Sequence, residues 1–193
     1  MTATFSNAVR TGARGVVLAL AAWSSPAFAQ EVEFTQIGLR DLIRESPAIL
    51  VVKRADPFVI TDGRSVESPD GKAEVWSEAK YRFEITDVLV ARPDLAGKLR
   101  GRTITVLPAD MDAQFQAFSN RVRKLELPKV KLRRYAPMGE RAFESDPSLI
   151  LFVKPATEGQ YSLSVTQAYE SLEQRKLVEE AITTVHAERQ KKG

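Results

Sequence analysis

The chain has 193 residues, and with 44% hydrophobic residues it can build a conventional core, while its formal net charge is only +3. It contains no cysteine and a single histidine, His186. A disulfide scaffold, a cysteine nucleophile and zinc sites made of several Cys and His side chains are therefore excluded. The length predicts one globular domain.

The first 29 residues have the segment order of a secretory signal peptide. Arg10 and Arg14 supply positive charge, residues 16–23 form an apolar run, and small residues end the segment at Ala29. The run is shorter than the ~20 residues that span a bilayer. The alternative is an amphipathic or buried N-terminal helix. We expect cleavage after Ala29, and export of residues 30–193 to the periplasm or, alternatively, out of the cell.

A short helix and a strand open the exported chain, after an N-terminal segment at residues 30–35 that is either mobile or a short edge strand. One face of the helix is formed by Leu39, Leu42 and Ile43. Pro47 ends the helix, because the residue before a proline is disfavoured in the α conformation. The continuous apolar run at residues 48–52 predicts a buried strand.

Residues 79–90 have the longest strand pattern and are predicted to form the central strand. Apolar and polar side chains alternate there, with the apolar ones at Tyr81, Phe83 and Ile85. The preceding residues 55–78 predict a loose hairpin with a short strand at 58–60. Turns are expected at residues 62–63 and 69–71, where glycine accepts the positive φ that such turns need.

Residues 93–101 predict a turn and residues 103–107 the next strand. Residues 109–146 have no strand pattern and predict a helical, basic insertion. Its helix has an apolar stripe with spacings of four and three, formed by Met111, Phe115, Phe118, Val122 and Leu125. Asp110 is expected to cap this helix and Pro128 to end it.

The C-terminal part predicts two strands, at residues 149–153 and 161–166, and a helix. Ser171 and Gln174 have the spacing of a capping box. The helix, residues 171–189, is expected to pack on the sheet through an apolar face formed by Val178, Ala181, Ile182 and Val185.

This order of elements predicts a mainly β protein with flanking helices (α+β). The expected architecture is a five-stranded OB-like barrel with a helical insertion at residues 109–146 and a C-terminal helix packed on it. No second apolar run of spanning length follows residue 29, so the exported chain is expected not to span a membrane.

Three sequence features form a recognisable pattern. They are the apolar strand at residues 49–53, the alternating strand that ends in Val88-Leu89, and Gly139-Glu140 before the strand at 149–153. It resembles secreted OB-like domains of the netrin and metalloproteinase-inhibitor type over most of residues 37–189. The resemblance implies this fold and a tendency to bind partners. Those inhibitors reach a catalytic zinc with an N-terminal Cys, which is absent here, so protease inhibition is not implied. The Gly139-Glu140 pair is also separated from its strand.

The residues do not form a recognisable catalytic constellation, so we expect no enzyme activity, cofactor or metal. His186 is expected to be a partly exposed helix residue, and neither a G-x-S-x-G motif nor a glycine-rich phosphate loop occurs. The close carboxylates are interpreted as solvated surface acids; they are Asp110 and Asp112, Glu140 and Glu144, and Glu179 and Glu180.

A basic cluster lies between residues 121 and 134, a segment that contains seven cationic side chains and only one acid, Glu126. The cations are Arg121, Arg123, Lys124, Lys129, Lys131, Arg133 and Arg134. This local charge predicts an anionic partner: an envelope component, such as a lipid headgroup, lipopolysaccharide or polyanionic glycan, or an acidic protein surface. Export argues against nucleic acid. The alternative interpretation is a solvated loop.

These observations favour a non-enzymatic periplasmic or secreted binding module. An alternative is a small secreted hydrolase that attacks an anionic polymer with two facing carboxylates, one of raised pKa. A further alternative is a structural partner that docks on a larger envelope complex through the apolar stripe of the insertion helix.

Overall fold

The computed structural model describes residues 32–99, 101–126, 129–139, 143, 145–157 and 159–191, with only the backbone of Val32. The predicted signal peptide at residues 1–29 lies outside the described residues, as do Pro128, Glu140 and Glu144. Within the described part, no helix combines the length and the apolar character needed to cross a membrane.

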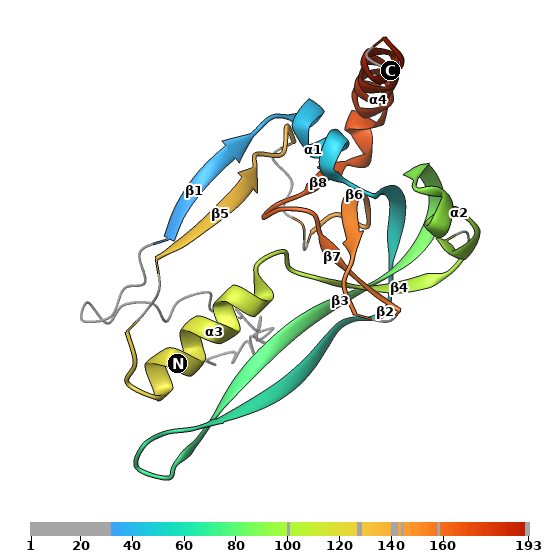
Figure 1. Cartoon of the computed structure of the whole chain (residues 1–193). Coiled ribbons are helices and arrows are strands. Elements are labelled where there is room, and N and C mark those ends of the chain that lie inside the picture. Colours follow the sequence, from blue (N-terminus) through green and yellow to red (C-terminus); the bar gives the residue numbers. More distant parts are fainter. Residues whose placement is uncertain are drawn as a thin grey trace, which may run out of the picture.

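Five strands in the described part of the chain close into a barrel (Figure 1). They are β2 (Ala48–Glu67), β3 (Ala73–Ala91), β4 (Thr103–Leu107), β6 (Ser148–Pro155) and β7 (Gln160–Leu163). The order around the barrel is β2, β3, β4, β7, β6 and back to β2, and only the β4–β7 pair is parallel. The short strand β8 (Tyr169–Ser171) pairs with β6. The predicted five-stranded OB-like barrel is confirmed.

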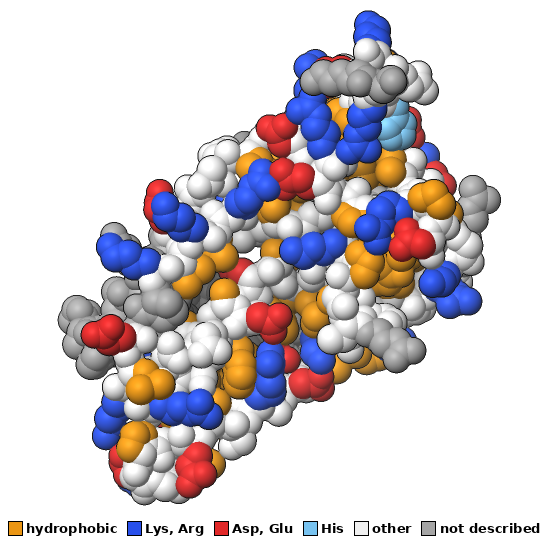
Figure 2. Space-filling model, viewed as in Figure 1, with side chains coloured by type: hydrophobic (Ala, Val, Ile, Leu, Met, Phe, Trp, Pro, Cys, Tyr) orange, Lys and Arg blue, Asp and Glu red, His pale blue; other side chains and the backbone are white. Residues whose placement is uncertain are grey.

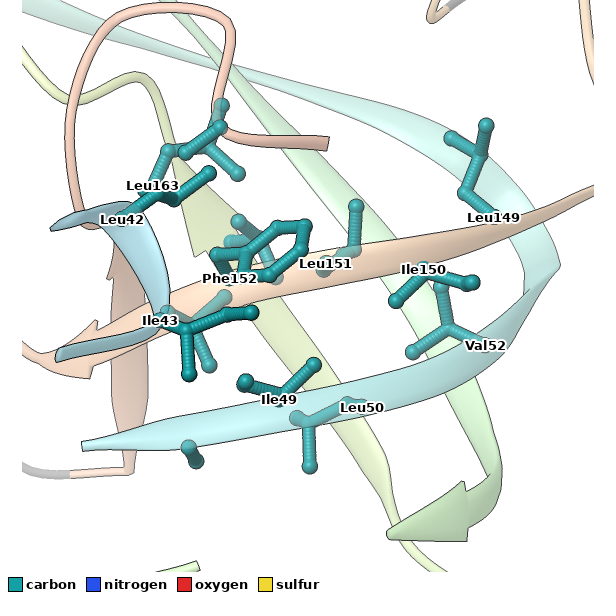
Figure 3. Close-up of a cluster of buried hydrophobic side chains, with 14 of the residues drawn as sticks. Leu42, Ile43, Ile49, Leu50, Val52, Leu149, Ile150, Leu151, Phe152 and Leu163 are labelled. Carbon is teal, nitrogen blue, oxygen red and sulfur yellow. The ribbon is translucent and has the colours of Figure 1, made fainter. Parts of the chain in front are cut away.

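The core is built where β2 and β6 run side by side (Figure 3). Residues 48–52 of β2 and 149–153 of β6 are buried on both faces of each strand, which explains their continuous apolar sequences. The same cluster includes Leu42 and Ile43 of α1 (Leu39–Glu45) and Phe83 of β3. Each large apolar side chain buried in this way contributes roughly 1.5–3 kcal/mol.

Beyond the barrel, β2 and β3 continue as a two-stranded arm, which Figure 1 shows extending below the barrel. We call residues 59–67 and 73–81 the arm. Its turn is the predicted one at 69–71, where Gly71 has a φ of 77° and its N–H donates to the Ser68 carbonyl at 2.9 Å. The predicted turn at residues 62–63 is wrong, because Gly63 lies inside β2 and pairs with Ser77.

The insertion between β4 and β6 contains the predicted helix, α3 (Met111–Val122), and also a strand, β5 (Val130–Tyr135). The prediction that residues 109–146 contain no strand is therefore wrong. β5 pairs in parallel with the N-terminal strand β1 (Val32–Ile37). The helix ends earlier than expected, and Lys124 turns the chain with a positive φ of 57°.

Two further helices complete the fold. α2 (Pro93–Leu99) forms where a turn was expected, because Leu95 and Leu99 are buried on one side of it. The C-terminal helix, α4 (Arg175–Gln190), buries its expected apolar side chains, Val178, Ile182 and Val185. A short 3-10 helix, η1 (Leu172–Gln174), precedes it, and the Ser171 hydroxyl caps this turn by accepting from the Glu173 N–H at 3.3 Å.

Candidate functional site

A cleft with a volume of about 900 Å³ lies between the arm, the start of α3 and the β6–β7 turn. Its charged lining residues are Asp62, Arg64, Glu78, Lys80, Asp112 and Lys154. The arm connects the first two barrel strands, and the β6–β7 turn connects the last two. In OB folds, these two connections and the adjacent barrel face commonly bind oligonucleotides or oligosaccharides.

Four charged side chains of the arm form one wall of the cleft. We call Asp62, Arg64, Glu78 and Lys80 the arm quartet. Asp62 lies directly opposite Glu78 across the two strands, and Arg64 and Lys80 lie two residues further along each strand, so all four share one face. The Lys80 ammonium is 2.5 Å from the Asp62 carboxylate, and Arg64 forms an ion pair with Glu78. The quartet is therefore charge-balanced.

Glu78 is the buried member of the quartet, with only 6% of the residue exposed. A buried carboxylate needs a close cation, which Arg64 provides. The Arg64 guanidinium is in turn held over the ring of Phe115 on α3, 3.9 Å from the ring centroid. The position of Glu78 thus depends on contacts between the arm and α3.

A small apolar cluster fixes the arm against α3. Val66 of β2 and Phe118 and Val122 of α3 are buried together, and the rings of Trp76 and Phe118 lie 5.2 Å apart. The cleft is consequently formed by packed elements, and binding would not require ordering of the arm.

A second hollow of about 350 Å³ adjoins the cleft, and both are lined by Ala109 and Lys154. The second hollow is also lined by Glu45, Asp110, Lys131 and Arg133. We call the two hollows together the groove. Lys154 lies at their junction, where it is exposed and has no ion pair with an acid among the residues that the structure describes. Figure 2 shows that this face of the molecule mixes both charges.

The structure divides the predicted basic cluster between two places. Arg121, Arg123 and Lys124 lie at the C-terminal end of α3 and do not line the groove. Arg121 lies over the ring of Phe118, 5.3 Å from its centroid, and the Lys124 ammonium is 3.1 Å from Asp70 at the tip of the arm.

The remaining cations lie on or next to β5. Lys131 and Arg133 are two residues apart, and both line the groove. Lys131 is 3.4 Å from Glu33 of β1, and Arg133 forms an ion pair with Glu45 of α1. Arg134 instead donates to Gln167 at 2.6 Å, while Lys129 is exposed just before the strand. Only Lys131 and Arg133 of the seven therefore meet in a hollow.

The acids singled out from the sequence do not form a facing pair in the described part of the chain. Asp110 and Asp112 line different hollows, and Glu179 forms a 2.7 Å ion pair with Arg175. His186 is exposed on α4, as expected. No group of three or more His, Cys, Asp or Glu residues that could hold a metal ion occurs among the described residues.

Sequence reasoning missed the carboxylates that do face each other, Asp62 and Glu78, because their segment was interpreted as a loose hairpin. One signal could have identified them. Charged residues two apart, at Asp62 and Arg64 and again at Glu78 and Lys80, have the period of a strand with one charged face.

A buried hydrogen-bonded pair fixes the C-terminal end of β5. Glu170 of β8 is completely buried and accepts hydrogen bonds from the Tyr135 hydroxyl and, at 3.0 Å, from the backbone N–H of Met138. Burial, together with the hydrogen bond to Glu170, raises the pKa of Tyr135 above its ordinary value. The folded state thus holds the phenolic proton more tightly than the unfolded chain does.

This shift predicts a loss of stability at alkaline pH. The contribution of Tyr135 is complete below its unfolded pKa of about 10 and is lost as the pH rises toward the folded pKa. Above about pH 10, the free energy of unfolding should fall with a slope up to about 1.4 kcal/mol per pH unit steeper than in Tyr135→Phe. Urea denaturation at several pH values measures both slopes. Parallel slopes would contradict the prediction.

No family model, curated protein or solved structure matches this chain, so its resemblance to netrin-type domains stays a prediction.

Proposed function

We propose that the exported chain is a non-enzymatic binding module of the periplasm or cell exterior, with the groove as its ligand site. The observation that carries this proposal is the cleft of about 900 Å³ between the two barrel connections. Its charged wall is held by ion pairs and by packing against α3, so the site is formed before a ligand arrives. Pre-organisation of this kind lowers the entropic cost of binding.

The cations of the groove support an anionic partner, either an envelope component or an acidic protein surface. Lys154 has no ion pair with an acid among the described residues. Lys131 contacts Glu33, but their side chains are 79% and 66% exposed. Such a surface pair contributes only about 0–1 kcal/mol, so a ligand anion can replace Glu33 at little cost. The export signal argues against a nucleic acid partner.

A charge-matched pair of variants tests the site. In Lys131→Gln/Lys154→Gln, binding to heparin–agarose and to phosphatidylglycerol vesicles should weaken by about 30-fold, because each of the two lysines contributes about 1 kcal/mol near an anionic surface. The control, Arg121→Gln/Arg123→Gln, removes the same charge from the end of α3 and should bind as the wild type does.

Two results would contradict the proposal. If the groove variant is retained like the wild type, the groove does not bind anions. If the control loses as much as the groove variant, the charge of the whole insertion is responsible, and the groove has no special role.

The hydrolase remains a second candidate, because Asp62 and Glu78 face each other across the arm. Directly opposed strand residues have Cβ atoms about 4.5–5.5 Å apart, so two such carboxyl groups can act on the same glycosidic bond. Both carboxylates are already ion-paired, with Lys80 and Arg64, whereas acid catalysis requires a protonated carboxyl group. Release of reducing ends from an anionic glycan by the wild type, abolished in Glu78→Gln, would favour the hydrolase.

A further inference from the structure

The two edges of β5 are used differently. One edge pairs with β1 along its whole length, from Val130 to Tyr135. The other edge faces the barrel and pairs only at its end, where the Tyr135 N–H donates to the Thr166 carbonyl at 2.9 Å and the Thr166 N–H donates to the Arg133 carbonyl at 3.0 Å. Towards Val130, the barrel-facing edge has no pairing segment in the described part of the chain.

The alternation of the strand identifies the backbone groups that remain unpaired. The N–H and C=O of one strand residue point to the same side, and those of the next residue point to the opposite side. Since Tyr135 and Arg133 bond towards the barrel, the N–H and C=O of Lys131 must point there too. The Arg133 N–H and both backbone groups of Lys131 thus have no backbone partner among the described residues.

These backbone groups border the groove. Lys131, Leu132 and Arg133 line its second hollow, and Ser164, Val165 and Thr166 line the hollow from the barrel side. Thr166 lies beside the C-terminal end of β5, where a third strand of the small sheet would pair. The residues before Thr166 do not continue along β5. They follow β6 instead, where the Ser164 N–H donates to the Phe152 carbonyl at 2.8 Å. The rest of that strand position is a hollow.

We propose that the ligand of the groove is an extended, acidic polypeptide segment that pairs with β5 at Lys131 and Arg133. This inference rests on the proposed function, which assigns ligand binding to the groove. A peptide supplies the repeating N–H and C=O groups that an open strand edge binds, whereas a glycan or a lipid headgroup does not. Acidic side chains suit the ammonium groups of Lys131 and Lys154.

The small sheet itself gains from such a partner. Parallel strands are rarely left open to solvent, and two strands alone are marginal. In β1, Phe34 is 47% exposed beside β5. A third strand between β5 and the barrel would make β1 and β5 part of a wider sheet.

Three anionic probes, two of them peptides of identical charge, test whether the ligand pairs with β5. The first probe is a capped peptide in which Glu and Val alternate, and the second is the same peptide N-methylated at every residue, which removes its backbone donors. Dextran sulfate, an anionic polymer without amides, is the third. We expect the N-methylated peptide to bind at least about tenfold more weakly than the first, because several backbone hydrogen bonds are lost.

Two variants at residue 131 separate the contribution of the side-chain charge to binding from that of the backbone N–H. Lys131→Gln removes the ammonium group and keeps the N–H, whereas Lys131→Pro removes both. Proline is tolerated on an edge strand where its N–H is not used. We expect the proline variant to bind the first peptide about tenfold more weakly than the glutamine variant. If the proline variant does not fold, the two peptides on the wild type decide the question.

The failure of this inference differs from that of the proposed function. Equal binding of both peptides and dextran sulfate, with all of them weakened by Lys131→Gln, would leave the groove as an anion site and overturn strand pairing. No binding of any probe would overturn both. Slower hydrogen exchange of the Lys131 and Arg133 amides with the first peptide, but not with dextran sulfate, would support strand pairing.

Discussion

Replacing Glu170 by alanine is expected to lower the free energy of unfolding by about 3–5 kcal/mol. Glu170 is completely buried, and its carboxylate accepts from the Tyr135 hydroxyl and the Met138 N–H. The substitution leaves both donors without a partner and opens a cavity. Urea denaturation measures the loss.

Two further variants show whether the hydrogen bonds cause this effect. Glu170→Gln keeps an oxygen acceptor and should recover a large part of the lost stability. Glu180→Ala, which makes the same change at an exposed position of α4, should stay within about 0.5 kcal/mol of the wild type. If Glu170→Ala cost less than about 1 kcal/mol, the pair would not anchor the end of β5 to the barrel.

Arg64→Ala should lower the free energy of unfolding by about 2 kcal/mol. Removing one partner of a buried ion pair costs about 3–5 kcal/mol, but the Arg64 side chain is 39% exposed, so solvent screening reduces this value. The loss includes the contact of the guanidinium with Phe115. Urea denaturation measures the total loss of stability. Hydrogen exchange shows whether the backbone amides of the arm become less protected.

A double variant tests whether the unpaired charge of Glu78 causes the loss of stability in Arg64→Ala. In the double variant Arg64→Ala/Glu78→Gln, no charge remains to be buried, so stability should partly return relative to Arg64→Ala alone. Asp112→Asn is the control, because the Asp112 side chain is fully exposed and lies 3.9 Å from Arg64. If Asp112→Asn destabilised the protein as much as Arg64→Ala, the effect would be one of general surface charge.

The barrel could be predicted because burial determines its sequence. The apolar runs at 48–52 and 149–153 and the alternation through Phe83 are the local marks of strands with buried faces. The C-terminal helix was equally readable, since Val178, Ile182 and Val185 repeat at helical spacing and are buried. At these positions the residue type alone indicates whether the side chain is buried.

β5 could not be predicted, because distant residues hold it in place. Its exposed cations meet Glu33 of β1 and Glu45 of α1, and its barrel edge bonds Thr166. A run of four cations in or next to this segment, read alone, suggests a solvated loop. Proximity in sequence was also misleading for the basic cluster, because the end of α3 and β5 place their charges in different surroundings.

The arm part of the candidate site was missed for a related reason. Glu78 is buried only because Arg64 lies beside it and Phe115 of α3 supports Arg64. Neither contact is visible in the sequence around Glu78, where polar residues favour an exposed hairpin. Long-range packing thus turned a segment with loop-like composition into the wall of a cleft.

The pairing of β2 has a kinetic consequence. Its hairpin with β3 is local, but Ala48 also pairs with Val153 of β6, on the far side of the whole insertion. Loop closure of this length slows folding, because the chain entropy must be lost before the contacts form. The local β2–β3 hairpin is therefore expected to form first, and β2 keeps one edge of unpaired backbone N–H and C=O groups until β6 pairs with it.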